Sequence, residues 1–393
     1  MIKANRLNEG TGLASEMGKG GARGLIELPF LRNTWYVAGW ISELQGSGPI
    51  GRTIIDKPIV LYRKRDGKLV ALEDRCAHRW APLSFGRVEG DDLRCMYHGL
   101  RYAADGQCVE IPGQDRVAKI LCVGTYPIFE KHRLMWVWMG DPQSADPSLI
   151  PDLGMLDQPS RRLYWGSLDY DAHYSLISDN LLDLSHFFFL HEKTVGRPVV
   201  TTHQGDLTPY TPGGSEAKPL ERGVRVESWV SGPVARNVLT PKKVPNGDLW
   251  TRTDFLVPGI FISYEQMYPE GTAQECKGLS PGAERVPLHD LMSIQAVTPM
   301  TLRTTRYFYS LGPRACDVDE EEADMMWEIT QAAFSEDLQM IQAQQRIIDA
   351  HPGNRMCGIA ADRGLTLFRN LMKKLIAAEN SAIDAKNSGT GVS

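Results

Sequence analysis

Two short cysteine–histidine pairs constrain this chain more than any other feature. One residue separates Cys76 from His78, two separate Cys95 from His98, and sixteen lie between the two pairs. Two thiolates and two imidazoles at such spacing could hold a tetrahedral zinc ion. They could also hold a [2Fe–2S] cluster in which two histidines replace two cysteines on one iron. Because each pair supplies one thiolate and one imidazole, both loops can reach both irons, and the pattern favours the cluster.

The residues around these pairs carry a family likeness. The first pair is followed by Arg79, Pro82, Leu83 and Ser84, and the second by Gly99. Over about residues 33–140 the chain resembles the Rieske domain of aromatic-ring and demethylating oxygenases. The resemblance implies that the two pairs bind a Rieske [2Fe–2S] cluster. Zinc, or two buried cysteines with two core histidines, remains the alternative interpretation.

A second set of potential metal ligands lies between residues 179 and 191. In a helix over about residues 172–190, Asn180, Asp183 and His186 would follow one side, since each is three residues after the one before. His191 lies five residues past His186, a rotation of ~140° on a helix. A straight helix could not direct both imidazoles at one metal, so we expect it to end or bulge there.

Two neutral imidazoles suit an iron(II) site that one carboxylate completes, with open positions left for oxygen. A long helix predicted over about residues 318–350 offers Asp337, which lies in the middle of its apolar face, whereas Glu336 lies at the border with the polar face. A carboxylate directed into a core needs a compensating cation. We therefore predict His186, His191 and Asp337 as ligands of one metal. The alternatives are a buried salt bridge from Asp337 to an arginine and two core histidines.

This second set also carries a family likeness. The segment from Asn180 to His191 resembles the catalytic domain of the Rieske oxygenases, and Phe334-x-Glu336-Asp337 followed by Gln344-Gln345 resembles their C-terminal carboxylate helix. Together the resemblances cover about residues 33–375. The intervals between Asn180 and Asp183 and between the two cysteine–histidine pairs are similar to those of vanillate O-demethylase and dicamba monooxygenase. In ring-dihydroxylating dioxygenases both intervals are usually one residue longer.

The resemblance implies the oxygenase component of a multicomponent Rieske non-haem iron monooxygenase. Such an enzyme takes electrons from NAD(P)H through a separate reductase, with or without a ferredoxin, and inserts one atom of O2 into an aromatic substrate. Oxidative O- or N-dealkylation is the reaction that this branch favours. The resemblance also implies a catalytic role for Asn180 and a homotrimer, in which Asp183 links His98 of one chain to His186 of the next. Respiratory Rieske proteins have an additional, disulfide-forming cysteine in each loop, and its absence here indicates a low-potential cluster supplied by a reductase.

Three other functions stay open at this point. A ring-hydroxylating dioxygenase would use the same two metal centres on another reaction. A Rieske electron-transfer protein would hold the cluster and no second iron, and a zinc-stabilised binding protein would have no redox role. The colour of the purified protein separates the last case, since a zinc protein is colourless and a Rieske protein is red-brown.

The order of predicted elements indicates an α+β fold. Short β-type runs punctuated by glycine fall at residues 35–40, 59–62, 69–72, 94–96 and 134–138. They predict an antiparallel β domain, which we assign to residues 26–150 as the Rieske domain, with a linker near 140–152. Runs such as 255–264 and helices near 318–350 and 362–378 predict a catalytic domain over residues 151–380, a central antiparallel sheet flanked by helices. We expect flexible tails over residues 1–25 and 381–393, and pocket walls from 195–310.

Composition excludes little but agrees with this interpretation. Hydrophobic residues make up 42% and charged residues 23%, and the net charge is −5, which favours neither nucleic acid nor an anionic membrane surface as partner. No apolar run approaches the ~18 residues of a membrane span. The first residues lack the apolar segment of a secretory signal. Seven scattered cysteines indicate a reducing compartment, so we expect a cytoplasmic protein.

Overall fold

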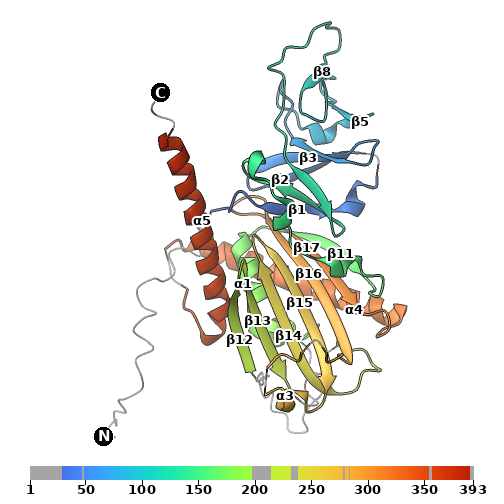
Figure 1. The fold of residues 1–393 in the computed structure, drawn as a ribbon, viewed down its shortest axis with the longest axis vertical. Coiled ribbons are helices and arrows are strands. Elements are labelled where there is room, and N and C mark those ends of the chain that lie inside the picture. The colour runs from blue at the N-terminus through green and yellow to red at the C-terminus, as the bar shows by residue number, and fades with distance from the viewer. Residues whose placement is uncertain are drawn as a thin grey trace.

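Two domains follow each other along the chain, a smaller one of short strands and a larger one with a long sheet and helices (Figure 1). The computed structural model describes residues 29–46, 48–196, 214–231, 238–277, 279–282, 284–353 and 356–389. The predicted tail over residues 1–25 lies outside the described residues. The α+β class predicted from the sequence is confirmed.

The N-terminal domain consists of three small antiparallel sheets, in the orders β1-β10-β9, β2-β3-β4 and β5-β6-β7-β8. Their bounds are β1 Trp35–Trp40, β2 Ile50–Ile54, β3 Lys57–Arg63, β4 Leu69–Glu73, β5 Arg87–Glu89, β6 Asp92–Arg94, β7 Arg101–Tyr102, β8 Cys108–Glu110, β9 Ile128–Lys131 and β10 Leu134–Trp138. The predicted runs 35–40 and 134–138 coincide with β1 and β10. The run predicted over 94–96 is wrong, because β6 ends at Arg94 and the next two residues form a loop.

The C-terminal domain is built on one seven-stranded antiparallel sheet, in the order β11-β17-β16-β15-β14-β13-β12. The strands are β11 Tyr164–Tyr170, β12 Gly214–Leu220, β13 Gly223–Val230, β14 Gly247–Leu256, β15 Ile260–Pro269, β16 His289–Pro299 and β17 Thr305–Pro313. The helices are α1 Tyr174–Leu182, α2 Phe187–Leu190, α3 Thr272–Glu275, α4 Glu320–Ala350 and α5 Arg363–Gly389. The predicted run 255–264 is a hairpin and not one strand, because Pro258 and Gly259 form the turn between β14 and β15.

Three helices cover one face of this sheet, where Phe255, Phe261 and Tyr307 form a buried core with side chains of α1, α4 and α5. α4 begins after Asp319, whose carboxylate accepts a hydrogen bond from the N–H of Glu322, and its first turn is acidic, as suits a helix N-terminus. α5 extends to Gly389 and so covers most of the segment 381–393 that we predicted as a tail. Alanines at 377, 378, 382 and 385 favour this extension. Among the described residues, no helix is both long and apolar enough to cross a membrane.

The two domains share a hydrophobic core on the other face of the long sheet. Trp40 and Trp138 of the N-terminal domain pack in one buried cluster with Ile262 and Phe308 of the C-terminal domain. The predicted linker 140–152 contributes the buried Ile150 to the same cluster. Each such side chain stabilises the assembly by about 1.5–3 kcal/mol relative to its exposed state. The domains are therefore held as one body, with β5 and β8 at the end that points away from the long sheet (Figure 1).

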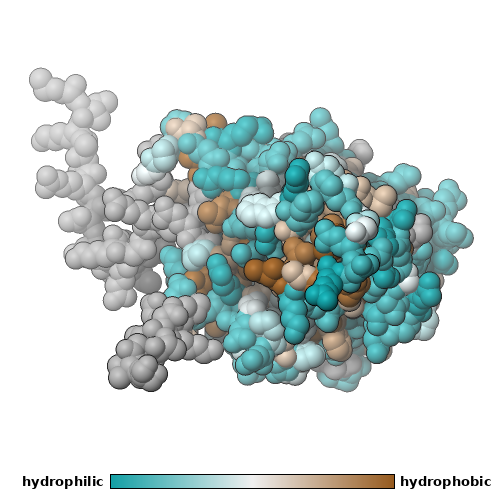
Figure 2. Space-filling view, turned by 90° about the horizontal axis from the view of Figure 1, so that it is seen from above, coloured by the Kyte–Doolittle hydropathy of each residue, from teal (hydrophilic) through white to brown (hydrophobic). Residues whose placement is uncertain are grey.

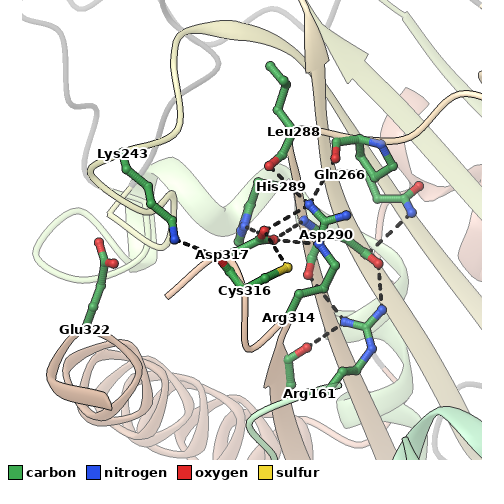
Figure 3. A network of polar contacts seen from close by, with 12 residues as sticks. Arg161, Lys243, Gln266, Leu288, His289, Asp290, Arg314, Cys316, Asp317 and Glu322 are labelled. Carbon is green, nitrogen blue, oxygen red and sulfur yellow. Dashed lines mark hydrogen bonds and ion pairs between the residues drawn. The ribbon is translucent and has the colours of Figure 1, made fainter. Parts of the chain in front are cut away.

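A network of polar contacts joins the start of β16 to the end of β17 (Figure 3). Arg161 donates to Asp290 at 2.6 Å, and Arg314 donates to both carboxylate oxygens of Asp317 at 2.8 and 3.0 Å. His289 is fully buried, with Nδ1 3.4 Å from Asp317. Burial alone would raise the pKa of Asp317, but the contacts with His289 and Arg314 outweigh it and hold that pKa well below its usual range. Because α4 follows directly, the network fixes the start of this helix.

We expect Asp317→Asn to lower the free energy of unfolding by about 2–3 kcal/mol at pH 7, because it leaves a partly buried guanidinium without its counter-charge. The depressed pKa makes this contribution present above the unfolded-state pKa of about 3.9 and lost as the pH falls through the folded-state value. The difference between the two proteins should therefore shrink below about pH 4. Urea unfolding followed by tryptophan fluorescence measures it. Glu275→Gln, which breaks an exposed pair with Arg285, is the control and should change stability little; equal effects of both variants would contradict the prediction.

Candidate functional site

Two loops of the N-terminal domain bring the predicted cluster ligands together. In the first loop the N–H of Cys76 donates to the carbonyl of Ala81, and the N–H of Trp80 donates to the carbonyl of Cys76, both at 2.9 Å. In the second loop the N–H of Gly99 donates to the carbonyl of Cys95 at 3.0 Å. Gly99 has φ +78°, a left-handed conformation that glycine adopts without strain. Each loop is thus a closed turn that holds its cysteine and its histidine.

The thiols of this site face inward and the imidazoles outward. Cys76 and Cys95 are 2% and 1% exposed, whereas His78 and His98 are exposed, with ring centroids 4.5 Å apart. The hydroxyl of Tyr102 lies 3.2 Å from the sulfur of Cys76 and so fixes its position. We did not predict Tyr102; its signal in the sequence is weak, because only a buried setting makes a tyrosine hydroxyl need such a partner.

The arrangement fits two irons better than one zinc ion. Burial raises the pKa of the Cys95 thiol, and the neighbouring Cys76 adds to the shift. Ligand atoms around a single tetrahedral ion would all lie within about 4 Å of one another. Within the described part of the chain, these two pairs do not form a group of three or more ligand atoms that all lie within 4.8 Å of one another. A pair of thiols inside and a pair of imidazoles outside is the donor set of a Rieske cluster.

The predicted mononuclear site does form such a group. One ligand atom each from His186, His191 and Asp337 lie within 4.8 Å of one another. Asp337 Oδ1 is 3.6 Å from His186 Nε2 and 3.3 Å from His191 Nε2. His191 is 1% and Asp337 5% exposed, so the centre is largely removed from water. Two imidazoles and one carboxylate around a common point are the donors of a non-haem iron(II) site.

The chain reaches this geometry through a break in the helix that differs from our expectation. We expected the helix to end or bulge between His186 and His191, but α1 already ends at Leu182. Asp183 has an extended backbone, and its carboxylate accepts the N–H of Ser185 at 2.9 Å, which caps a short 3-10 turn over Leu184–His186. The side chain of Asp183 therefore starts a new turn instead of continuing the old helix. The new turn rotates the two histidines toward one point.

Each histidine is oriented by a second partner on the nitrogen that faces away from the centre. His186 Nδ1 lies 2.6 Å from the carbonyl of Asp183, and His191 Nδ1 lies 2.8 Å from Glu336 Oε2. The hydroxyl of Thr194 also donates to Glu336, at 2.7 Å. A carbonyl and a carboxylate accept hydrogen bonds, so both Nδ1 atoms carry the proton and both Nε2 atoms present a lone pair that a metal could take. We did not predict this role of Glu336, although its place at the border of the apolar face of α4 was visible in the sequence.

The charges around the centre favour a cation. Burial lowers the pKa of His186, although the charge of Asp337 opposes the shift. Burial would also lower the pKa of His191, but Asp337 and Glu336 outweigh it and raise that pKa. Asn180 Nδ2 donates to Asp337 Oδ1 at 2.9 Å and lies 3.3 Å from His186 Nε2. Two acidic side chains beside two imidazoles thus match a bound divalent ion.

A salt bridge with α5 anchors the helix that carries Asn180. Arg369 of α5 binds the carboxylate of Asp179, which is the residue before Asn180. Burial raises the pKa of Asp179 to about 6, although Arg369 opposes the shift. Asp337, for which a buried salt bridge to an arginine was the alternative, has His186, His191 and Asn180 as its polar contacts among the described residues.

A row of uncharged polar side chains lies on the sheet face toward the helices. Gln295 stands opposite Phe261 and Tyr309 in register, and opposed residues share one face of a sheet. Gln295 Nε2 donates to Ser293 Oγ at 2.6 Å, and Ser263 Oγ lies 3.4 Å from Gln295 Oε1. These residues fall in the predicted wall region 195–310, part of which (197–213 and 232–237) lies outside the described residues. The row gives this face hydrogen-bonding groups without charge.

Two protein-family models match the chain over these two sites. The Rieske [2Fe-2S] domain model matches residues 34–127, and the model of the vanillate O-demethylase oxygenase C-terminal domain matches residues 170–378. The first range contains both cysteine–histidine pairs and the second contains His186, His191 and Asp337.

Individual proteins are similar over nearly the full length. The iron–sulfur subunit of the toluene-4-sulfonate monooxygenase system of Comamonas testosteroni is 35% identical over 364 residues, which cover 89% of this chain and 98% of that protein. The oxygenase component of dicamba O-demethylase from Stenotrophomonas maltophilia is 33% identical over 332 residues, covering 81% and 89%. The crystal structure of dicamba monooxygenase bound to dicamba matches with a TM-score of 0.76 at 29% identity, covering 90% of this chain and 99% of that one.

Proposed function

Because this chain belongs to the Rieske non-haem iron oxygenases, as an oxygenase component, we propose that it inserts one atom of O2 into an aromatic substrate at the site of His186, His191 and Asp337. One observation carries the proposal: the two Nε2 atoms and Asp337 Oδ1 converge on a buried point, while hydrogen bonds on both Nδ1 atoms fix their direction. A Rieske electron-transfer protein or a zinc-stabilised binding protein has no use for this second centre.

The surrounding residues have separate tasks in this proposal. Bound iron would supply the reduction of O2 to an oxidant that attacks a C–H bond. Asn180 keeps Asp337 in place through its amide, and Glu336 keeps the proton of His191 on Nδ1. The uncharged row around Gln295 offers hydrogen bonds to polar groups of the substrate. Electrons reach the site from a reductase through the cluster of Cys76, His78, Cys95 and His98.

We further propose a homotrimer in which each cluster serves the neighbouring chain. The loops around the cluster histidines expose large apolar side chains: Trp80 is 70%, Phe85 80%, Met96 54% and Tyr97 61% exposed. Figure 2 views the molecule from the end at which the N-terminal domain lies, and hydrophobic residues are exposed there among hydrophilic ones. Exposed apolar patches of this kind mark protein–protein contacts. On the other domain, Phe189 is 79% exposed three residues after His186, which gives the patch a counterpart near the metal site.

We expect the reaction to be mono-oxygenation that ends in oxidative dealkylation of an aromatic ether or N-alkyl compound. A lone pair on oxygen or nitrogen weakens the neighbouring C–H bond, and the hydroxylated carbon then collapses to an aldehyde and a dealkylated product. The measurement is turnover of the reconstituted enzyme under ¹⁸O2 with a panel of aromatic ethers, N-alkyl amides and aromatic acids. One aldehyde should form per O2 consumed, and it should carry label when exchange with water is prevented.

The same experiment tests the competing reaction. A ring-hydroxylating dioxygenase would form a cis-dihydrodiol that carries both labelled atoms and would release no aldehyde. Such a product would place the chain with the dioxygenases and overturn the proposal. Protein without added reductase is the control and should form neither product.

A further inference from the structure

A continuous row of aromatic rings leads from the metal site toward the surface. The rings belong to β11, β17 and α4, which pack against one another. Consecutive ring centroids are 5.9 Å apart for Tyr170–Tyr307, 5.5 Å for Tyr307–Tyr309, 5.5 Å for Tyr309–Trp327 and 5.7 Å for Trp327–Tyr164. Every member is a tyrosine or a tryptophan, the side chains that lose one electron most readily among the aromatic residues. A row of phenylalanines would fill the same core without this property.

The inner end of the row lies beside the metal ligands. Tyr307 packs on Phe334 at 5.4 Å, and Phe334 is one helical turn before Asp337 on α4. Burial raises the pKa of Tyr170 and of Tyr307, and the negative charge of Asp337 adds to both shifts. The buried hydroxyl of Tyr307 has no hydrogen-bond partner among the described residues. Among the described residues Tyr307 thus has no base to take its proton, so an electron deficit on this ring does not settle there as a neutral radical and instead moves on to the next ring.

A glycine leaves room for the ring in the middle of the row. Gly166 of β11 stands opposite Tyr309 of β17, and a Cβ at this position would lie 2.9 Å from the ring of Tyr309. The missing side chain lets Tyr309 lie flat between Tyr307 and Trp327, with interplanar angles of 23° and 32°. Tyr309 also has a hydrogen bond with Gln331, an amide that is a poor proton acceptor. The contact between inner and outer rings thus depends on one small residue.

The outer end differs from the rest because it has a base. The hydroxyl of Tyr164 donates to Asp324 Oδ1 at 2.6 Å, and Asp324 is exposed. A phenol that has lost an electron is strongly acidic, so its proton passes to such a carboxylate. Tyr164 is therefore the ring of the row on which an electron deficit can settle as a neutral radical.

We propose that this row carries oxidising equivalents from the metal site to the surface and so protects the ligands when O2 is reduced without attack on substrate. This role rests on the proposed function of the site. For each oxidising equivalent left at the site, one electron would leave the row at Tyr307 or Tyr170. Electrons from Tyr309, Trp327 and Tyr164 then move inward in turn, and the Tyr164 proton passes to Asp324. A thiol or ascorbate in solution returns one electron and one proton to the Tyr164 radical, and the exposed Asp324 releases its proton to water.

The test exposes the iron-loaded protein to hydrogen peroxide without substrate and compares three variants with the wild type. Tyr164→Phe and Trp327→Phe keep an aromatic ring in place but make it hard to oxidise. Tyr268→Phe, whose ring pairs with Trp250 at 5.4 Å outside the row, is the matched control. Freeze-quench electron paramagnetic resonance detects the radical. Peptide mass spectrometry measures oxidation of His186 and His191.

The wild type and Tyr268→Phe should form a tyrosine-type radical and keep their metal ligands largely intact. Tyr164→Phe and Trp327→Phe should lose this radical and accumulate severalfold more oxidised His186 and His191. Equal radical yield and equal ligand damage in all four proteins would contradict the proposed role of the row in electron transfer. Iron content is measured first: a wild type that binds no iron at this site contradicts the ligand assignment instead. If Trp327→Phe alone loses iron, Tyr164→Phe, which removes only the hydroxyl at the outer end, decides the question.

Discussion

Asp337→Ala should abolish oxygenation and remove the mononuclear iron while the Rieske spectrum stays intact. Asp337 supplies the only carboxylate of the three-ligand group, and without it the metal would have two neutral imidazoles and no anionic ligand from this group. A fully loaded wild-type chain should hold about three irons and about two acid-labile sulfides, and the variant should lose about one iron. Iron and sulfide analysis, the visible spectrum and product formation measure these quantities.

The matched control is Glu328→Ala, which removes an exposed carboxylate from the same helix. It should keep all three irons and its activity. An Asp337→Ala protein that retains its activity would rule out this carboxylate as a ligand. Loss of the cluster spectrum together with the iron would instead indicate a general failure of folding.

Asp183→Asn should leave the metal content normal and reduce turnover by about tenfold to a hundredfold, the range found for residues that support metal ligands. The structure makes this substitution a clean test of charge. An asparagine oxygen can still accept the N–H of Ser185, and the carbonyl that orients His186 belongs to the backbone. What disappears is the negative charge that we place between His98 of one chain and His186 of the next. Single-turnover kinetics with a pre-reduced cluster measures the electron transfer directly.

Mixed trimers test the direction of that transfer. A chain with Cys95→Ala lacks the cluster, and a chain with Asp337→Ala lacks the mononuclear iron, so each alone should be inactive. When the two are co-assembled, an intact cluster of one chain faces an intact iron site of its neighbour, and activity should return. Mixed assemblies that stay inactive while each chain keeps its other centre would show that electrons travel within one chain.

For the Asp183→Asn protein, turnover at the wild-type rate would contradict the prediction and would show that the electrons bypass this residue.

The positions of the two proposed ligand sets could be predicted because the information that places them is local. Cys76 and His78, like Cys95 and His98, are close in sequence, and the loops that hold them are closed by backbone hydrogen bonds within a few residues. Asp337 is far from the histidines in sequence, but a long regular helix makes its position on the apolar face readable from periodicity alone. The structure places it 5% exposed, next to both imidazoles.

Features that depend on tertiary contacts could not be predicted in this way. The helix breaks at Asp183 because this side chain accepts a hydrogen bond from the N–H of Ser185. The same sequence could also continue as a helix, so the sequence alone does not decide between the two conformations. The role of Glu336 requires His191 to arrive from another element. The hairpin at residues 255–264 was a different kind of error, since Pro258 and Gly259 are a visible turn signal inside an apolar run.

The shared core between Trp40, Trp138, Ile262 and Phe308 limits how such a chain can be divided. A fragment cut near residue 150 would expose one half of that core on each piece, so an isolated cluster domain would aggregate. For the same reason, a hybrid oxygenase made by exchanging one domain with that of a relative would have to preserve the packing of this shared core. It would also have to preserve the path of the electrons between the two centres. Modular engineering of this protein therefore calls for exchange of whole chains or of single loops.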